Sequence, residues 1–442
     1  MKKIFYCCLL GITISLIGCA SEDRDDAIIN IPADTSASTT TTTTTSTPTE
    51  PVANLEINDY IWKGLNQYYF WQEEVDELAD SKTTNAAEYN TFLGSVVDPS
   101  DFFDSLNHED DRFSWIEENY VDLQNQLAGI SASNGMKFYV TRQCQTCNEL
   151  VAVVTYVLPE SDAAAKGIER GNLITSINGR DLSVENYVQL LYGDLMTYTV
   201  GLASYNQDTQ IFESTGGSVV LDKVENFQEN PIHKNIILEA GDRSVGYLMY
   251  NQFVASFDDQ LIQVFSDFAS QNITDLVLDL RYNGGGSVRT CAYLASMITG
   301  QFTNEIFAQQ LWNSKLMDYF DNLNNNSDPD DDRELNNYFT NATVDGASLP
   351  GLNLSTVYIL TTKRSASASE LLINGLAPHI NVVQIGETTV GKNVGSISIY
   401  DYIDNNGTKN PDHTYAMQPI VLKIANSEGF ADYSDGLVPN TA

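Results

Sequence analysis

The stretch STVYILTTKRSASASELLINGLAPHINVVQIG, Ser355 to Gly386, decides the fold because two apolar runs enclose a helical stripe. Its ends, STVYILTT and NVVQIG, have the length and apolar content of buried strands. Counted from Ala368, positions i, i+3, i+4, i+7 and i+8 hold Ala, Leu, Leu, Gly and Leu, which form one buried helical face. Strand, helix and strand in this order predict a crossover unit of an α/β fold.

The same alternation begins near residue 227 and predicts that residues 227–442 form an α/β core with a mostly parallel or mixed sheet. A polar insertion is predicted between Phe302 and Leu349. Its acidic segment, NNNSDPDDDRE, lacks the spacing and the turn glycine of an EF-hand loop, so we expect a solvated loop rather than a calcium site. The other predicted elements of this core are the strands SVGYLMY (244–250) and ITDLVLDL (273–280) and the helices 257–270 and 291–299.

Two further regions precede the core. Residues 54–128 place Ile61 and Leu65 at helical spacing and predict a small helical region with a tryptophan- and tyrosine-rich interior. Residues 129–226 predict a β-rich module with an Asn178-Gly179 hairpin turn. Its run SDAAAKGIERGNLITSING resembles the second half of a PDZ domain, a module that captures extended carboxy-terminal peptides by strand addition. A PDZ-like spacer without a ligand is the alternative.

The first residues predict a targeting segment. Residues 1–19 contain a basic start, MKK, an apolar run, and the ending LIGC, which resembles a bacterial lipobox with Cys19 as the lipidated residue. An ordinary cleaved signal peptide is the alternative. Residues 20–53 are rich in threonine and are predicted to be a disordered tether. Acidic residues directly after Cys19 resemble a surface-export signal, so we expect a Gram-negative outer membrane lipoprotein, at the cell surface or on the periplasmic face, anchored by acyl chains alone.

Composition excludes several partners. The chain has 442 residues and a formal net charge of -36, without a basic patch, which argues against nucleic acid and anionic membrane surfaces. Cys144 and Cys147 form one C-x-x-C pair, but a zinc site would need two more ligands and no second pair exists. The pair is therefore expected to be a small loop disulfide or two free thiols. No metal or organic cofactor is predicted.

The serines of the opening stretch allow two interpretations. A tight turn between a strand and a helix lifts a nucleophile clear of a sheet, and Ser367 stands at such a turn. The helix N-terminus would let the Ala368 amide stabilise a negative oxygen. The alternative is a helix cap, in which Ser367 and Glu370 form a capping box. The glycines of DLRYNGGGS could also direct amides at an oxyanion; phosphate binding competes, but the known phosphate motifs do not fit.

Three motifs in one order resemble those of the carboxy-terminal processing, or tail-specific, serine peptidases: DLRYNGGG (279–286), RSASASE (364–370) and GETTVGK (386–392). The resemblance extends over most of the chain from about residue 55. It implies a crotonase-like, ClpP-like α/β protease core behind a PDZ-like domain. It also implies a Ser-Lys dyad, with Ser367 as nucleophile and Lys392 as general base.

The resemblance further implies an oxyanion hole formed by the amides of Ala368 and of Gly285 or Gly286, with Glu370 as a third, supporting residue. One departure concerns Ser396, which stands where the family often has a glutamine four residues past the lysine. The residue that orients Lys392 is therefore left open.

The chemistry requires Lys392 to act as a neutral amine. Burial favours this form because desolvation penalises an ammonium, whereas a carboxylate in contact would favour the ammonium. We therefore expect neither Glu370 nor Glu387 to contact the amine. His379 is a rival base, but it follows a helix end where exposure is expected.

The sequence thus predicts an extracytoplasmic serine endopeptidase that acts on proteins or peptides recognised through their carboxy-terminal tails. The alternative is a non-catalytic surface lipoprotein that binds peptides or other ligands on the same scaffold. Glycan binding at the cell surface is a third and weaker hypothesis.

Overall fold

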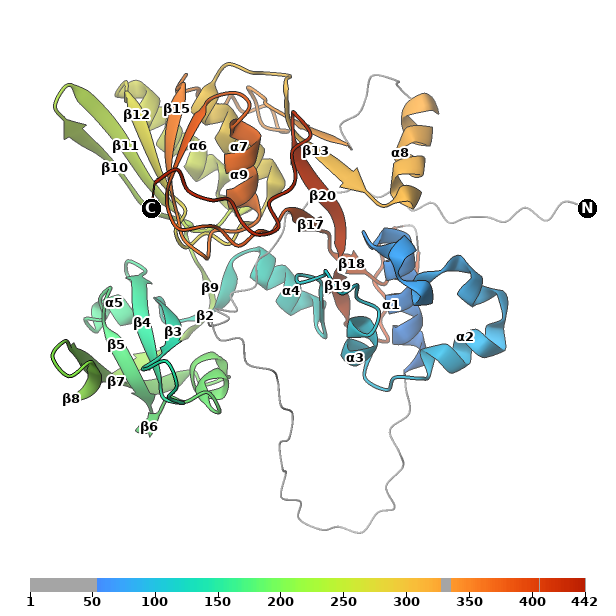
Figure 1. Cartoon of the computed structure of the whole chain (residues 1–442), viewed down its shortest axis with the longest axis horizontal. Helices are drawn as coiled ribbons and strands as arrows, with labels where there is room; N and C mark the ends of the chain where they lie inside the picture. The colour runs from blue at the N-terminus through green and yellow to red at the C-terminus, as the bar shows by residue number, and fades with distance from the viewer. Residues whose placement is uncertain (1–53, 327–334, 405, 442) are drawn as a thin grey trace, which may run out of the picture. The chain divides into compact units, whose positions relative to one another are not determined.

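The chain folds as two units in the computed structural model, which describes residues 54–326, 335–404 and 406–441 (Figure 1). The core unit comprises residues 54–128 and 230–441, and the β-rich unit comprises residues 129–229. The predicted targeting segment, Cys19, the tether 20–53 and most of the acidic segment 324–334 lie outside the described residues. Within the described part, none of the helices has the length and hydropathy needed to cross a bilayer.

Two sheets organise the carboxy-terminal part of the core unit. The central sheet has the order β10-β11-β12-β15-β16; its first pair is antiparallel and the others are parallel, so the predicted mixed sheet is confirmed. The second sheet, β14-β13-β20-β17, is antiparallel throughout. Helices α6, α7 and α9 pack with the central sheet in one apolar core (Figure 1). The elements are β10 (Ile232–Ala240), β11 (Arg243–Tyr250), α6 (Asp258–Ser270), β12 (Asp275–Asp279), α7 (Val288–Thr299), β13 (Ile306–Trp312), α8 (Ser314–Asn326), β14 (Asn336–Tyr338), β15 (Thr356–Thr361), α9 (Ala368–Leu376), β16 (Asn381–Gly386), β17 (Val394–Ser396), β18 (Ile399–Tyr400), β19 (Ala416–Gln418) and β20 (Ile420–Asn426).

The region between Phe302 and Leu349 is more ordered than the sequence suggested. It contributes β13, α8 and β14, and Phe307 and Ala308 of β13 are fully buried. Polar composition hid this strand, because its apolar residues are interrupted by Gln309 and Gln310, which lie in the sheet.

The amino-terminal region joins the core unit through a third sheet. Its strand β1 (Trp115–Glu117) pairs with β19, with Trp115 opposite Gln418 and Glu117 opposite Ala416. The predicted helical region is confirmed, and Met417 of β19 belongs to its apolar core. Its helices are α1 (Leu55–Tyr68), α2 (Ala86–Leu93), α3 (Pro99–Asp104) and α4 (Tyr120–Leu127), with short 3-10 turns at Gln72–Glu74, Asp76–Leu78 and Asp80–Thr84.

The main sheet of the β-rich unit is antiparallel, with the order β3-β4-β5-β7-β8 and with β6 paired to β5. Strands β2 and β9 form a separate antiparallel pair. Asn178 and Gly179 both have positive φ, 51° and 74°, as the predicted hairpin turn between β5 and β6 requires. The strands are β2 (Ile130–Ser133), β3 (Met136–Arg142), β4 (Leu150–Val157), β5 (Leu173–Ile177), β6 (Arg180–Asp181), β7 (Thr197–Asn206), β8 (Ile211–Asp222) and β9 (Val224–Gln228), with helix α5 (Asp162–Ala165) and a π-helical turn at Val188–Tyr192.

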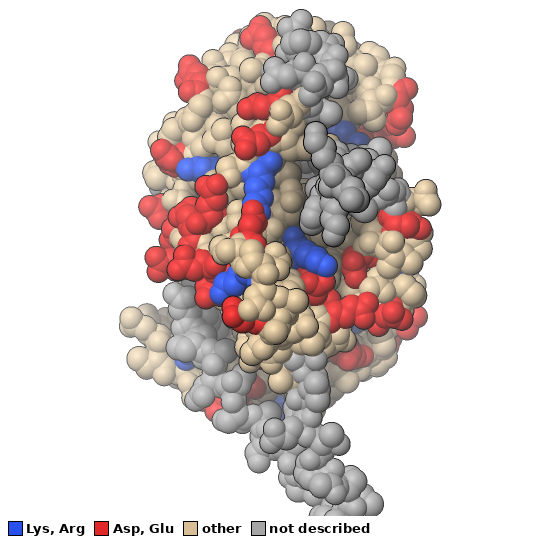
Figure 2. Space-filling view, turned by 90° about the vertical axis from the view of Figure 1, so that its right-hand side faces the viewer, with Lys and Arg blue, Asp and Glu red and all other residues tan. Residues whose placement is uncertain are grey.

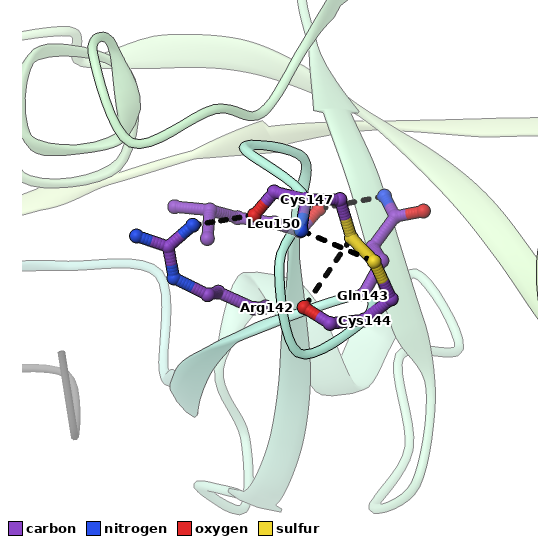
Figure 3. Close-up of a disulfide and its surroundings, with 5 residues drawn as sticks. All are labelled: Arg142, Gln143, Cys144, Cys147 and Leu150. Atoms are coloured by element: carbon purple, nitrogen blue, oxygen red, sulfur yellow. Dashed lines mark hydrogen bonds between the residues drawn. A yellow bond between two sulfur atoms is a disulfide. The ribbon is translucent and has the colours of Figure 1, made fainter.

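The cysteine pair of this unit forms a disulfide within the loop between β3 and β4 (Figure 3). Arg142 donates to the Cys147 carbonyl oxygen, and Gln143 Nε2 donates to the Leu150 carbonyl oxygen at 2.9 Å. Of the two states that the sequence allowed, the structure therefore has the disulfide.

Among the charged side chains on the face shown in Figure 2, acidic ones are more common than basic ones. This distribution agrees with the formal net charge of -36.

Close packing of α9 on β13 can be tested at Gly375. A Cβ added there would lie 2.4 Å from the Phe307 ring, so Gly375→Ala should lower the free energy of unfolding by about 1–3 kcal/mol. The midpoint of thermal unfolding measures the change. The double variant with Phe307→Leu should recover part of the loss, because the smaller side chain makes room; equal midpoints for Gly375→Ala and wild type would contradict the packing.

Candidate active site

The fold brings the two predicted turns together at one edge of the central sheet. Strands β12 and β15 are parallel neighbours, with Asp279 opposite Leu360. The glycine turn follows β12, and the serine turn follows β15. Because carboxyl ends of parallel strands meet at the same edge, the two motifs become adjacent although they are about 80 residues apart.

Ser367 adopts a strained backbone conformation at the start of α9. Its φ of 57° and ψ of -115° lie in a region that residues other than glycine rarely occupy. Such a residue costs roughly 1–3 kcal/mol and persists only where its surroundings hold it. The sharp strand-to-helix turn resembles a nucleophile elbow, and Ser367 also forms the predicted capping box with Glu370.

The outer two serines of RSASASE tie the serine turn to the glycine turn. The Ser365 hydroxyl donates to the Leu280 carbonyl oxygen at 2.8 Å, and the Ser369 hydroxyl donates to the Asn283 carbonyl oxygen at 2.9 Å. Both serines are fully buried. The repeat therefore consists of two structural serines around the one at the strained position.

The glycine turn lies directly against Ser367. Gly285 and Gly286 have φ of 115° and 129°. A Cβ on Gly285 would lie 2.7 Å from Ser367 Cβ and 3.0 Å from the Ala368 nitrogen, and one on Gly286 would lie 2.2 Å from the Phe253 carbonyl oxygen. Glycine is required at both positions by backbone conformation and by close approach.

The backbone N–H groups of Gly285 and Gly286 differ in their hydrogen bonding. The Gly285 N–H donates to Asn283 Oδ1 at 2.8 Å and is therefore occupied. The N–H groups of Gly286 and Ala368 have no acceptor among the residues that the structure describes. These two amides, on adjoining turns, are the ones available to a developing negative oxygen.

Glu370 joins the serine turn to the loop that precedes β17. Its side chain is fully buried and accepts four hydrogen bonds, and burial raises the pKa of this carboxyl while those hydrogen bonds act to lower it. The donors are the N–H of Ser367 (2.8 Å), the N–H of Lys392 (2.8 Å), the N–H of Gly391 (2.6 Å) and the hydroxyl of Thr389 (2.6 Å). One carboxylate thus holds both candidate catalytic residues by their backbones.

Lys392 is buried, with 6% of its surface exposed. Its Nζ lies 5.1 Å from the centroid of the Phe113 ring. Among the described residues, no carboxylate oxygen lies within 4.0 Å of this nitrogen, so neither Glu370 nor Glu387 pairs with it. No hydrogen bond joins Lys392 Nζ to Ser367 Oγ in this conformation.

Two other residues that the sequence analysis considered, His379 and Ser396, make no hydrogen bond to Ser367 or Lys392. His379 was expected to be exposed, but its side chain is only 9% exposed and packs against the rings of Phe302 and Phe339. Its Nε2 lies 3.2 Å from the Ile306 carbonyl oxygen. Ser396 is buried in β17 and pairs with β20, and no hydrogen bond joins it to Lys392.

Sequence reasoning missed three residues at the site. Thr389 lies inside the GETTVGK motif and could have been noticed there. Arg112 and Phe113 are about 280 residues from Lys392, and nothing in the local pattern marks them. Within the described residues, no cluster of three or more His, Cys, Asp or Glu could hold a metal ion.

Comparison with known proteins matches two family models. Residues 244–415 match the model of peptidase family S41, and residues 56–115 match the model of the peptidase S41 N-terminal domain.

Among curated relatives, the chain is 24% identical over 280 residues to a carboxyl-terminal-processing protease of Picosynechococcus sp. and 24% identical over 407 residues to the chloroplastic carboxyl-terminal-processing peptidase 1 of Arabidopsis thaliana. The first match covers 62% of this chain and 58% of the relative, and the second covers 87% and 72%.

Two solved structures share the fold. A crystal structure assigned to an S41 protease from Bacteroides fragilis is 25% identical, with a TM-score of 0.63 and coverage of 86% of this chain and 89% of that one. The photosystem II D1 C-terminal processing protease is 17% identical, with a TM-score of 0.51 and coverage of 88% and 92%.

The role of Glu370 as an internal tie can be tested by Glu370→Gln. The amide replaces one acceptor oxygen by a donor and leaves two backbone N–H groups without an acceptor, so the free energy of unfolding should fall by about 2–4 kcal/mol. Urea denaturation measures the change. Glu387→Gln is the matched control in the same loop, because Glu387 is exposed and accepts only one long hydrogen bond, 3.4 Å from the Lys363 nitrogen; equal losses in the two variants would refute the role.

Proposed function

This chain belongs to peptidase family S41, and we propose that it is an endopeptidase that cleaves protein or peptide chains through an acyl-enzyme on Ser367. One observation supports this proposal above the others: a strained serine, two amides without an acceptor among the described residues and a buried lysine lie on three adjoining segments. Glu370 joins the serine turn to the lysine loop, and the Ser365 and Ser369 hydroxyls join the serine turn to the glycine turn. A serine that served only as a helix cap would need neither the lysine nor the free amides.

The proposed reaction begins with attack of Ser367 Oγ on the carbonyl carbon of the scissile bond, while the neutral amine of Lys392 takes the hydroxyl proton. The oxygen of the tetrahedral intermediate accepts hydrogen bonds from the Gly286 and Ala368 amides. Lys392 then returns the proton to the leaving amine, and water hydrolyses the acyl-enzyme with Lys392 again as base. Removing one such amide donor typically lowers kcat by roughly 10²–10³-fold.

A change of side-chain rotamer must bring Lys392 Nζ to Ser367 Oγ. The lysine backbone is held by Glu370, whereas its side chain has four rotatable bonds. Catalytic hydrogen bonds are often formed only when substrate is bound, so the missing contact is compatible with this role. The lysine side chain is buried, and among the described residues no carboxylate forms an ion pair with its amine.

Recognition of carboxy-terminal tails is proposed for the β-rich unit. Among the described residues, strand β3 lies at one end of the sheet and pairs with β4, and addition of an extended peptide at a sheet edge is the mode of binding that PDZ domains use. The PDZ-like run of residues 161–179 and the names of the carboxyl-terminal-processing relatives support this assignment.

Location is proposed from the amino-terminal sequence. Lipidation at Cys19 would place the enzyme on the outer membrane of a Gram-negative cell, facing the periplasm or the surface, with acyl chains as its anchor. The second candidate function, a non-catalytic surface binder on the same scaffold, would not require the Ser367 and Lys392 side chains.

Nucleophile and base are tested with Ser367→Ala and Lys392→Met on casein and on peptides with free carboxyl termini. Both variants should lose roughly 10³-fold or more in kcat/KM and keep the thermal midpoint of wild type. Lys363→Met is the matched control, an exposed lysine beside the same turn, and should cleave like wild type. Undiminished cleavage by Ser367→Ala would remove the nucleophile assignment, and tight peptide binding by a wild type that never cleaves would favour the binder.

Tail recognition predicts a preference for a free terminal carboxylate. Two peptides that differ only in a carboxylate or an amide at the carboxy terminus should differ about tenfold in kcat/KM, with the amide poorer, because charge-assisted hydrogen bonds to the carboxylate are lost. Acetylation of the amino terminus is the control and should change little. Equal rates for both carboxy termini would contradict the proposed recognition.

A further inference from the structure

Phe113 lies against the side chain of Lys392. The Nζ atom is 5.1 Å from the ring centroid. Among the described residues, Nζ makes no hydrogen bond and no ion pair, and its contact is the cation–π contact with the Phe113 ring. Ser396 stands where related peptidases often have a glutamine, and it makes no hydrogen bond to the Lys392 amine.

The ring is held in place by the backbone around it. Asp111 Oδ1 accepts the N–H groups of Phe113 and Ser114, both at 2.9 Å, and Asp111 Oδ2 accepts the hydroxyl of the fully buried Tyr69 at 2.7 Å. Ser114 Oγ in turn accepts the N–H of Ile420 at 2.8 Å. Phe113 is therefore presented by a rigid turn that is attached to the second sheet.

Arg112 holds the lysine loop from the same turn. Its Nη2 donates to the carbonyl oxygens of Gly391 and Ser434, at 3.1 and 2.9 Å. Glu370 accepts the N–H groups of Gly391 and Lys392 in the same loop. The N–H groups of Gly391 and Lys392 and the carbonyl oxygen of Gly391 are thus all hydrogen-bonded. The lysine can therefore move mainly by rotation about its side-chain bonds.

We infer that Phe113 is a positioning residue for Lys392, so that the amino-terminal segment 111–115 completes the catalytic site of the core; this inference rests on the proposed function. The physical reason lies in what an aromatic face offers an amine. It attracts an ammonium and confines the rotamers of the lysine, but it has no oxygen that would retain the proton as a carboxylate does. The ring therefore restricts the position of the Lys392 amine without forming an ion pair with it.

The experiment compares variants at Phe113 in the full chain, with a peptide substrate and with a fluorophosphonate probe that reacts with the Ser367 hydroxyl. Phe113→Met keeps a long apolar side chain but loses the aromatic face, and it should lower kcat about tenfold and leave KM within about twofold. Probe labelling should slow by the same factor. Phe113→Tyr keeps the face and should retain the wild-type kcat, since the ring is only half-buried.

Phe92→Met is the matched control. Phe92 belongs to the same region and holds Lys82 Nζ 5.0 Å from its ring centroid, the same kind of contact away from the site, so its loss should not change kcat. Phe113→Leu is a second variant should the methionine variant fail to fold, with the same expected loss.

A wild-type kcat and labelling rate in folded Phe113→Met or Phe113→Leu would overturn the inference. Equal losses in the tyrosine and methionine variants would also overturn it, because packing rather than the aromatic face would then explain the effect. Failure of the proposed function gives a different result, since Lys392→Met would then cleave as wild type does.

Discussion

The site depends on one buried carboxylate. Glu370 has no contact with solvent, and its two oxygens accept four hydrogen bonds from Ser367, Thr389, Gly391 and Lys392. A buried acceptor of this kind is costly unless its hydrogen bonds are complete, so each donor is held in place by the others. The serine turn and the lysine loop consequently cannot separate without exposing an unsatisfied charge.

The strained backbone of Ser367 and the close approach of Gly285 to it both follow from the anchoring of the serine turn. Ser367 is kept at a positive φ because the helix that follows it and the glycine turn beside it are both anchored, the latter by the Ser365 and Ser369 hydroxyls. Gly285 then approaches within a distance that no side chain would allow. What results is a prearranged set of free amides, which is the arrangement that electrostatic stabilisation of an oxyanion requires.

The amino-terminal region is part of this arrangement rather than an appendage. Its strand β1 pairs with β19, its Arg112 holds the carbonyl of Gly391, and its Phe113 faces the lysine amine. The separate match of residues 56–115 to an S41 N-terminal model agrees with a region that is a regular part of these proteins. The β-rich unit, by contrast, has its own core and its own sheet.

The sequence by itself determined the parallel β-α-β succession, the helix after Ser367 and the three motifs, because apolar periodicity and glycine or serine turns are local properties. It also determined that Ser367 and Glu370 share a helix start. It did not reveal β13, whose apolar residues are interrupted by glutamines, nor the burial of the His379 side chain. Only the tertiary structure decided that Gly286 rather than Gly285 has a free amide, that Glu370 binds the lysine loop, and that Phe113 faces Lys392, because these contacts join segments that are far apart in the chain.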